Sequence, residues 1–130
     1  MSELDINHYK RIFAQPLPGE SAQNKMSPSS RVTGMNRPDR YLARSSSVMI
    51  LFFEKDHRIF IPLIKRSCYP GSHSGQISLP GGKAEPFDAS LCATALRETH
   101  EELGIDSNSI EIIGSLTPLY IPVSNFNVQP

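Results

Sequence analysis

The chain has 130 residues, which is enough for one domain of ordinary size and not for two. Its 13 lysine and arginine residues are balanced by 13 aspartate and glutamate residues, so nucleic-acid binding through bulk positive charge is excluded. It has only two cysteines, no apolar stretch near the roughly 20 residues of a membrane span, and no apolar core of a secretory signal at its start. We therefore expect a cytoplasmic protein whose partners include neither a nucleic acid nor a membrane.

Residues 1–44 are predicted to form a short helix followed by an arm. Four apolar side chains in the first part have the spacing of an amphipathic helix: Leu4, Tyr9, Ile12 and Phe13. Residues 15–44 contain four prolines and two glycines and show no period, which is typical of an irregular arm. The basic residues of this arm are either solvated loop charges or contacts for a phosphorylated ligand.

From residue 46 the pattern changes to that of strands. Residues 46–53 form an apolar run rich in β-forming residues, and the polar residues 54–57 have the length of a hairpin loop. Residues 58–66 continue as a strand that Pro62 would place at an edge or a bulge. A short strand is predicted at residues 76–79, within a loop rich in glycine and proline.

Residues 88–103 carry the strongest helix signal in the chain. Asp88 or Ser90 can cap the start of this helix, and Gly104 stands where a C-terminal glycine belongs. Another strand is predicted at residues 111–116, and an extended tail follows it. The apolar stripe of the helix is expected to face a core: Cys92, Leu96, Thr99 and Leu103.

Three carboxylates on this helix lie at i, i+3 and i+4, and so share one face within one turn: Glu98, Glu101 and Glu102. Like charges this close repel one another, and a hard divalent cation such as Mg²⁺, which prefers carboxylate oxygens, would relieve the repulsion. The adjacent Arg97 could orient a carboxylate or contact a phosphate. Taken alone, the cluster could also be a solvated acidic face.

A glycine pair precedes the helix. Gly81 and Gly82 let the backbone approach a ligand closely, although the same pair could simply form a tight turn. A glycine-rich loop that leads into a helix with clustered carboxylates is a more specific pattern than either part, and it favours a metal site.

This stretch resembles the signature of the Nudix hydrolases, G-x5-E-x7-R-E-U-x-E-E-x-G-U, in which U is a bulky apolar residue. The second half of the signature is matched from Arg97 to Ile105, with Thr99 at the first U. In the first half, alignment on Gly82 places Asp88 where the family has glutamate, and eight residues instead of seven separate it from Arg97. We interpret this as a one-residue insertion with aspartate in place of glutamate, although Asp88 could serve only as a helix cap.

Within the superfamily the chain resembles the coenzyme A pyrophosphatases. Their pattern places a glycine four residues before an F-P-G-G loop and an arginine four residues before that glycine. Gly75 and residues 79–82 fit this pattern with leucine for phenylalanine, whereas Gly71 stands at the arginine position. The resemblance covers about residues 45–130.

The resemblance implies an α/β fold, an α/β/α sandwich with a mixed sheet, in residues 45–130. A Nudix domain needs further strands and a second helix after the signature, so we expect the fold to be incomplete at its C-terminus. The expectation is that the sequence is a piece of a longer chain, or that a partner chain completes the sheet, for example in a homodimer.

The resemblance also implies metal-dependent hydrolysis of a nucleotide substrate, a nucleoside diphosphate linked to another group. The most specific expectation is cleavage of coenzyme A or a derivative to 3′,5′-ADP and phosphopantetheine. The alternatives are another Nudix substrate (ADP-ribose, a dinucleotide or a nucleoside triphosphate) and a binding module without catalysis.

The residues of the expected site follow from the same resemblance. The ligands of Mg²⁺ or Mn²⁺, which would also be catalytic together with Arg97, are Glu98, Glu101 and Glu102. The expected substrate contacts are Gly81, Gly82, His73 and Gly75. His73 could instead only hydrogen-bond within its loop, His100 is expected to be an exposed helix residue, and Tyr120 and Phe126 could either stack on a base or pack.

Overall fold

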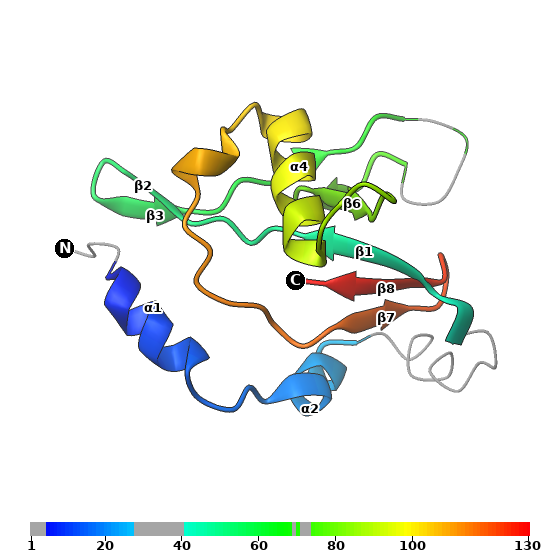
Figure 1. Cartoon of the computed structure of the whole chain (residues 1–130), viewed down its shortest axis with the longest axis horizontal. Coiled ribbons are helices and arrows are strands. Elements are labelled where there is room, and N and C mark those ends of the chain that lie inside the picture. The colour runs from blue at the N-terminus through cyan, green and yellow to red at the C-terminus, as the bar shows by residue number, and fades with distance from the viewer. Residues whose placement is uncertain (1–4, 28–40, 69, 71–73) are drawn as a thin grey trace.

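The structure is a computed structural model, and it describes residues 5–27, 41–68, 70 and 74–130. Its centre is a four-stranded sheet in the order β6-β1-β8-β7 (Figure 1). The bounds of these strands are Gly81–Lys83 for β6, Arg44–Val48 for β1, Phe126–Gln129 for β8 and Leu119–Ile121 for β7. β1 is parallel to β8 and antiparallel to β6, and β7 is antiparallel to β8. The predicted α/β fold class with a mixed sheet is therefore confirmed.

One long helix lies across the sheet, over β1 and β6 (Figure 1). This helix, α4, spans Leu91–Leu103. Of the two predicted caps, Ser90 is the N-cap, and its hydroxyl accepts a hydrogen bond from the Ala93 N–H at 3.1 Å. Gly104 ends the helix with a φ of 70°, a left-handed conformation that glycine adopts without strain. The predicted helix is thus confirmed, with a start three residues later than expected.

The face of α4 that packs on the sheet is made of small side chains. Thr94, Ala95 and Thr99 are buried there. They fit closely because β1 and β6 present serine and glycine residues to the helix. The stripe predicted from the sequence was therefore partly wrong: Thr99 is buried, but Cys92 is exposed.

The predicted hairpin is confirmed, although the strand before it is interrupted. β1 ends at Val48, and the chain pairs again only as β2, Phe53–Lys55, with β3, Arg58–Phe60. Asp56 and His57 form the turn with φ values of 52° and 57°, as a two-residue hairpin loop with the right twist requires.

The strand predicted at residues 58–66 is likewise split, into β3 and β4. The break contains Pro62, which cannot donate a hydrogen bond to a ladder. β4, Ile64–Lys65, pairs antiparallel with β5, Ile77–Ser78, as a separate two-stranded unit.

The N-terminal segment contains two helices. α1 spans Ile6–Phe13 as predicted, whereas α2, Gly19–Lys25, lies in the arm that was expected to be irregular. For residues 19–25 that expectation was wrong because Pro16 and Pro18 precede α2, where proline does not interrupt a helix. Residues 28–40 of the predicted arm lie outside the described residues. Both helices lie beside the connection that leads from α4 to β7 (Figure 1).

The contacts of these helices are specific. The Tyr9 ring stacks on Phe52, with the ring centroids 5.5 Å apart. The Gln23 side-chain amide donates to the carbonyl of Thr117 at 2.8 Å. The N-terminal helices therefore pack on residues of the part that resembles a Nudix domain.

The strand predicted at residues 111–116 was wrong: this segment has no regular secondary structure. Residues 111–116 lie beside α1, not beside a free strand edge, and Phe13 packs against Gly114. Among their backbone groups, the Leu116 N–H bonds to the carbonyl of Pro130 at 2.9 Å. The tail that was expected to be merely extended instead forms β7 and β8 of the central sheet.

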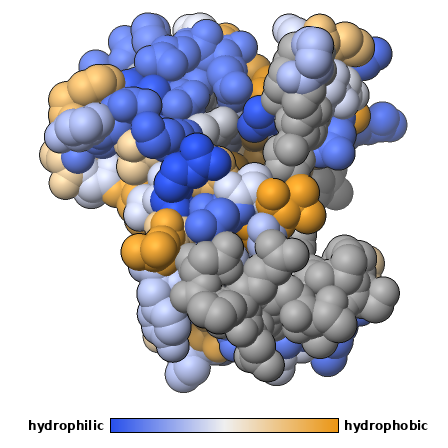
Figure 2. Space-filling view, turned by 90° about the vertical axis from the view of Figure 1, so that its right-hand side faces the viewer, coloured by the Kyte–Doolittle hydropathy of each residue, from blue (hydrophilic) through white to orange (hydrophobic). Residues whose placement is uncertain are grey.

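In the part of the chain that the structure describes, no helix is long and apolar enough to cross a membrane. On the face shown in Figure 2, hydrophobic residues are scattered among hydrophilic ones wherever the surface is coloured.

Candidate functional site

The predicted glycine pair and the predicted carboxylates lie against each other. Glu98 rests on Gly82, where an added Cβ would lie 2.5 Å from the carboxyl carbon of Glu98. The carboxylate of Glu102 accepts a hydrogen bond from the Gly81 N–H at 3.0 Å. β6 thus brings its backbone to the acidic face of α4, and only a residue without a side chain leaves room for Glu98.

Gly81 has a different structural role from that of Gly82. Its φ of 154° is rarely adopted by residues with a side chain, and an added Cβ would lie 2.6 Å from the Cα of Val48. Gly81 therefore lets β6 pair closely with β1, and Gly82 makes space for the carboxylate.

Arg97 holds the acidic face in place. Its Nε and Nη2 donate to the two carboxylate oxygens of Asp88, each at 3.0 Å. Its Nη1 donates to Glu98 at 2.8 Å and to Glu101 at 3.3 Å, and Nη2 also donates to the carbonyl of Lys83 at 3.1 Å. Because all three nitrogens have protein partners, Arg97 orients carboxylates here, which was one of its two predicted roles.

Asp88 is the residue of the candidate site whose contacts were least evident from the sequence. Its side chain is 5% exposed, and its Oδ2 also accepts from the Glu85 N–H and from the Thr94 hydroxyl, each at 2.9 Å. The Arg97 guanidinium and the Glu85 N–H hold the pKa of Asp88 well below its usual range. Asp88 is not the helix cap. The one signal for its role was its place at the signature glutamate after a one-residue insertion.

Burial and like charges act together on Glu102. Loss of water around its carboxylate raises its pKa, and the Gly81 hydrogen bond opposes this. The charges of Glu98 and Glu101 add to the increase, whereas that of Arg66 reduces it. A positive charge placed among these carboxylates would be stabilised electrostatically.

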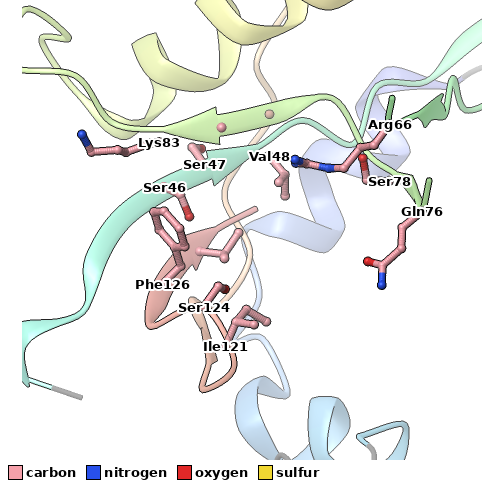
Figure 3. Close-up of a pocket in the computed structure, with 13 residues that line it drawn as sticks. Ser46, Ser47, Val48, Arg66, Gln76, Ser78, Lys83, Ile121, Ser124 and Phe126 are labelled. Carbon is pink, nitrogen blue, oxygen red and sulfur yellow. The ribbon is translucent and has the colours of Figure 1, made fainter. Parts of the chain in front are cut away.

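A pocket of about 470 Å³ lies on the opposite face of the sheet from α4. Ser46 and Val48 of β1 point away from α4 into this pocket (Figure 3). Gly81 and Gly82 line it too, so β6 separates the acidic face from the pocket. Sequence reasoning missed the pocket because its walls come from strands that are far apart along the chain.

The remaining predicted residues are distributed differently. His73, like Gly71, lies outside the described residues. Gly75 has a φ of 67° and its N–H donates to Ser67, which is the geometry of a loop turn. His100 is exposed, as expected, and its Nδ1 lies 3.1 Å from the carbonyl of Ile105.

The two aromatic candidates also differ. Tyr120 is 2% exposed and its hydroxyl donates to Asn125 at 3.0 Å, so it packs in the core. Phe126 lines the pocket, and the guanidinium carbon of Arg44 lies 4.1 Å from its ring centroid.

The donor set fits a hard divalent cation in its chemistry. Three carboxylates share one helical turn, and Glu98 and Glu102 both face β6. As they stand, no three acidic, histidine or cysteine side chains in the described ranges converge closely enough to hold a metal ion. Arg97 helps to keep the carboxylates of Glu98 and Glu101 in their present positions, because it donates hydrogen bonds to both. To hold a metal ion, these carboxylates would have to turn toward one another.

Comparison with known proteins places the site in a family. The NUDIX domain model matches residues 43–129. The chain is 43% identical over 82 residues to Nudix hydrolase 15, mitochondrial, and 40% identical over 82 residues to Nudix hydrolase 22, chloroplastic, both from Arabidopsis thaliana. It is 46% identical over 68 residues to the uncharacterized Nudix hydrolase NudL of Yersinia enterocolitica. The cytoplasmic location stays a prediction.

These matches cover 62%, 62% and 52% of this chain, respectively. They cover only 29%, 27% and 34% of the relatives. The chain therefore spans about a third of the length of the curated relatives it matches.

Proposed function

This chain belongs to the NUDIX domain family, and from that membership we propose that it hydrolyses the pyrophosphate linkage of a nucleoside diphosphate derivative with the help of a divalent metal ion. The observation that carries the proposal is the contact between the acidic face of α4 and the glycine pair of β6, where Glu98 rests on Gly82 and Glu102 accepts from Gly81. This contact joins clustered carboxylates to a glycine backbone without side chains, which suits an anionic substrate and its cation.

We assign the metal ligands to Glu98, Glu101 and Glu102, one of which also acts as the base. Mg²⁺ or Mn²⁺ at this position would neutralise phosphate charge and lower the pKa of a bound water. Arg97 is a positioning residue, because its donors are occupied by Asp88, Glu98 and Glu101. Of the two glycines, Gly81 is buried and its N–H already donates to Glu102, so a phosphate or the cation would approach the partly exposed backbone of Gly82.

For the substrate we propose coenzyme A or a derivative, cleaved to 3′,5′-ADP and phosphopantetheine. The support is the sequence pattern from Gly75 to Gly82. Gly71 at the arginine position of that pattern favours a second candidate, another Nudix substrate such as ADP-ribose, a dinucleotide or a nucleoside triphosphate. A binding module without catalysis ranks below both, because the glutamate cluster is present.

A product screen tests the proposal. The chain is incubated with coenzyme A, ADP-ribose, NADH and nucleoside triphosphates, each with Mg²⁺ and with Mn²⁺, and the products are separated by chromatography. We expect coenzyme A to yield 3′,5′-ADP and phosphopantetheine, and EDTA to stop the reaction. Cleavage of ADP-ribose alone would replace the substrate assignment, and no cleavage of any compound would overturn the function.

A matched pair of variants tests the ligand assignment. Glu102→Gln removes one ligand charge and should lower metal-dependent turnover by at least about 100-fold while the fold is kept. Glu111→Gln makes the same chemical change at a carboxylate that pairs with Lys10 on the surface, and should leave turnover unchanged. Full activity of Glu102→Gln would contradict the assignment.

A further inference from the structure

The pocket behind the glycine pair combines an apolar floor with a polar wall. Strand pairing places Ser46 opposite Val128 and Ile121 opposite Phe126, so these side chains share the face that points away from α4. With Val48 they make the floor, in which Ser46 is polar and the other four side chains are apolar. A volume of about 470 Å³ is that of a pocket for a small organic molecule.

The polar wall comes from the β4–β5 unit. Ile64 pairs with Ser78, and the Arg66 N–H donates to the carbonyl of Gln76 at 2.9 Å. Because side chains alternate along a strand, Arg66, Gln76 and Ser78 project from the same face, and all three line the pocket. In Figure 3 the guanidinium of Arg66 extends across the pocket toward Val48.

Two side chains of this wall, Arg66 and Ser78, leave hydrogen-bonding capacity unused. Within the described ranges, no carboxylate forms an ion pair with Arg66. The hydroxyl oxygen of Ser78 is buried and has no hydrogen-bond partner. A partly buried guanidinium beside an unsatisfied hydroxyl is a site for an anion, and a guanidinium can bind a phosphate through two parallel hydrogen bonds.

The pocket is also continuous with the acidic face. Gly81 and Gly82 line the pocket on one side and contact Glu102 and Glu98 on the other. Arg66 is near enough for its charge to act on the Glu102 carboxylate. A ligand whose pyrophosphate lies at the glutamates therefore reaches the pocket around the edge of β6.

We propose that this pocket binds the phosphorylated nucleoside half of the substrate, with its ring system on the floor beside Phe126 and one phosphate on Arg66 and Ser78. The inference rests on the proposed function for the position of the pyrophosphate. A neutral pantetheine arm would use the apolar floor but would leave the Arg66 charge without a partner. Arg66 is thus a specificity-determining residue, which supplies the positive charge that the sequence lacks at position 71.

Binding without turnover tests the inference. Isothermal titration calorimetry, in buffer with EDTA and no metal, measures the affinity of the 130-residue chain for adenosine 3′,5′-bisphosphate, adenosine and inorganic phosphate. The wild type should bind the bisphosphate about 10-fold or more tightly than adenosine, and more tightly than phosphate. Arg66→Ala should bind the bisphosphate no more tightly than adenosine. Arg66→Lys should keep part of the difference in affinity, because a lysine keeps the charge but cannot form two parallel hydrogen bonds to a phosphate.

The control is Arg58→Ala, which removes an exposed arginine at the start of β3, outside the pocket, and should bind like the wild type. Circular dichroism and a thermal midpoint establish that each variant is folded. Wild-type affinity in folded Arg66→Ala, or adenosine binding as tight as bisphosphate binding, would overturn the inference.

The variant Glu102→Gln separates the inference from the proposed function. It should bind the bisphosphate at least as tightly as the wild type, because a negative charge near Arg66 is removed, while its turnover is lost. If the wild type binds the bisphosphate but hydrolyses no substrate, the proposed function is contradicted and the pocket assignment stands. If the wild type hydrolyses a substrate but does not bind the bisphosphate, the pocket assignment is contradicted and the proposed function stands.

Discussion

Arg97 and Asp88 form a two-pronged ion pair, in which Nε and Nη2 of the arginine each lie 3.0 Å from a different carboxylate oxygen. The arginine side chain is 20% exposed and the aspartate side chain 5%. The pair fixes the guanidinium, whose remaining nitrogen then orients Glu98 at 2.8 Å. The position of a predicted metal ligand therefore depends on a residue that does not itself lie in the acidic cluster.

We predict that Arg97→Lys lowers kcat by about 10–100-fold with a smaller effect on KM. An ammonium group cannot bind both oxygens of Asp88 and still reach Glu98, so the ligand would lose its orientation. Steady-state kinetics on the best substrate of the screen measures both constants. Arg58→Lys, at an exposed site on β3, is the matched control, and an unchanged kcat for Arg97→Lys would contradict the prediction.

The same ion pair predicts an acid-dependent loss of stability. The Arg97 guanidinium, aided by the Glu85 N–H, holds the pKa of Asp88 well below its ordinary value of 3.8. In the unfolded chain Asp88 takes up a proton near pH 3.8, whereas in the folded chain it does so only at lower pH. Its stabilisation is thus complete above about pH 5 and is lost as the pH falls through 3.8 toward the folded pKa.

Asp88→Asn measures this contribution. The variant should be less stable than the wild type at pH 6, and the difference in the free energy of unfolding should shrink as the pH is lowered to 3. Urea denaturation followed by circular dichroism at pH 6, 4.5 and 3 gives the three differences. A difference that is the same at all three pH values would show that Asp88 does not act through its charge.

Local patterns explain what could be predicted from the sequence. The bounds of α4 follow from periodicity, from the Ser90 cap and from Gly104, all of which lie within one stretch of chain. The β2–β3 hairpin is marked by the polar residues of its turn. The glutamates and the glycine pair of the site also lie within one short stretch of the sequence, so they could be predicted together. The structure brings them into contact.

Contacts between distant parts of the chain explain what could not be predicted. The parallel pairing of β1 with β8 joins Arg44 to Phe126, and no local signal marks it. The pocket depends on this pairing, because its floor comes from both strands. The strand expected at 111–116 had suitable residues, but its neighbour in the fold is α1, which offers no strand edge.

Two neighbouring glycines should respond differently to alanine. In Gly82→Ala the new Cβ meets the end of the Glu98 side chain, which can swing away, so the fold should survive while turnover falls by about 100-fold. In Gly81→Ala the Cβ meets the backbone of Val48 at a φ of 154°, so the chain should lose about 1–3 kcal/mol of stability or more. Thermal unfolding and kinetics of both variants test the contrast, and equal losses of stability would contradict it.

Two buried threonines of α4 give a second contrast. The Thr94 hydroxyl donates to the Asp88 carboxylate at 2.9 Å, whereas the Thr99 hydroxyl donates to the Ala95 carbonyl of its own helix at 2.7 Å. We expect Thr94→Val to cost about 1.5–3 kcal/mol, because a hydrogen bond to a charged group is lost. Thr99→Val should change stability by less than about 1 kcal/mol, since the bond it removes supports the helix little. Urea denaturation at pH 7 distinguishes the two, and a larger loss for Thr99→Val would reverse the assignment.

The contact between Phe13 and Gly114 predicts how α1 is held. A Cβ on Gly114 would lie 2.7 Å from the Cγ of Phe13, so Gly114→Ala should displace the ring and loosen α1, at a cost of about 1–3 kcal/mol. Trypsin should then cleave faster at Lys10 and Arg11, which lie in the last turn of this helix. Mass spectrometry of timed digests measures the cleavage rate, with Ser115→Ala as the control at an adjacent exposed residue. Cleavage of Gly114→Ala at the wild-type rate would mean that α1 does not depend on this contact.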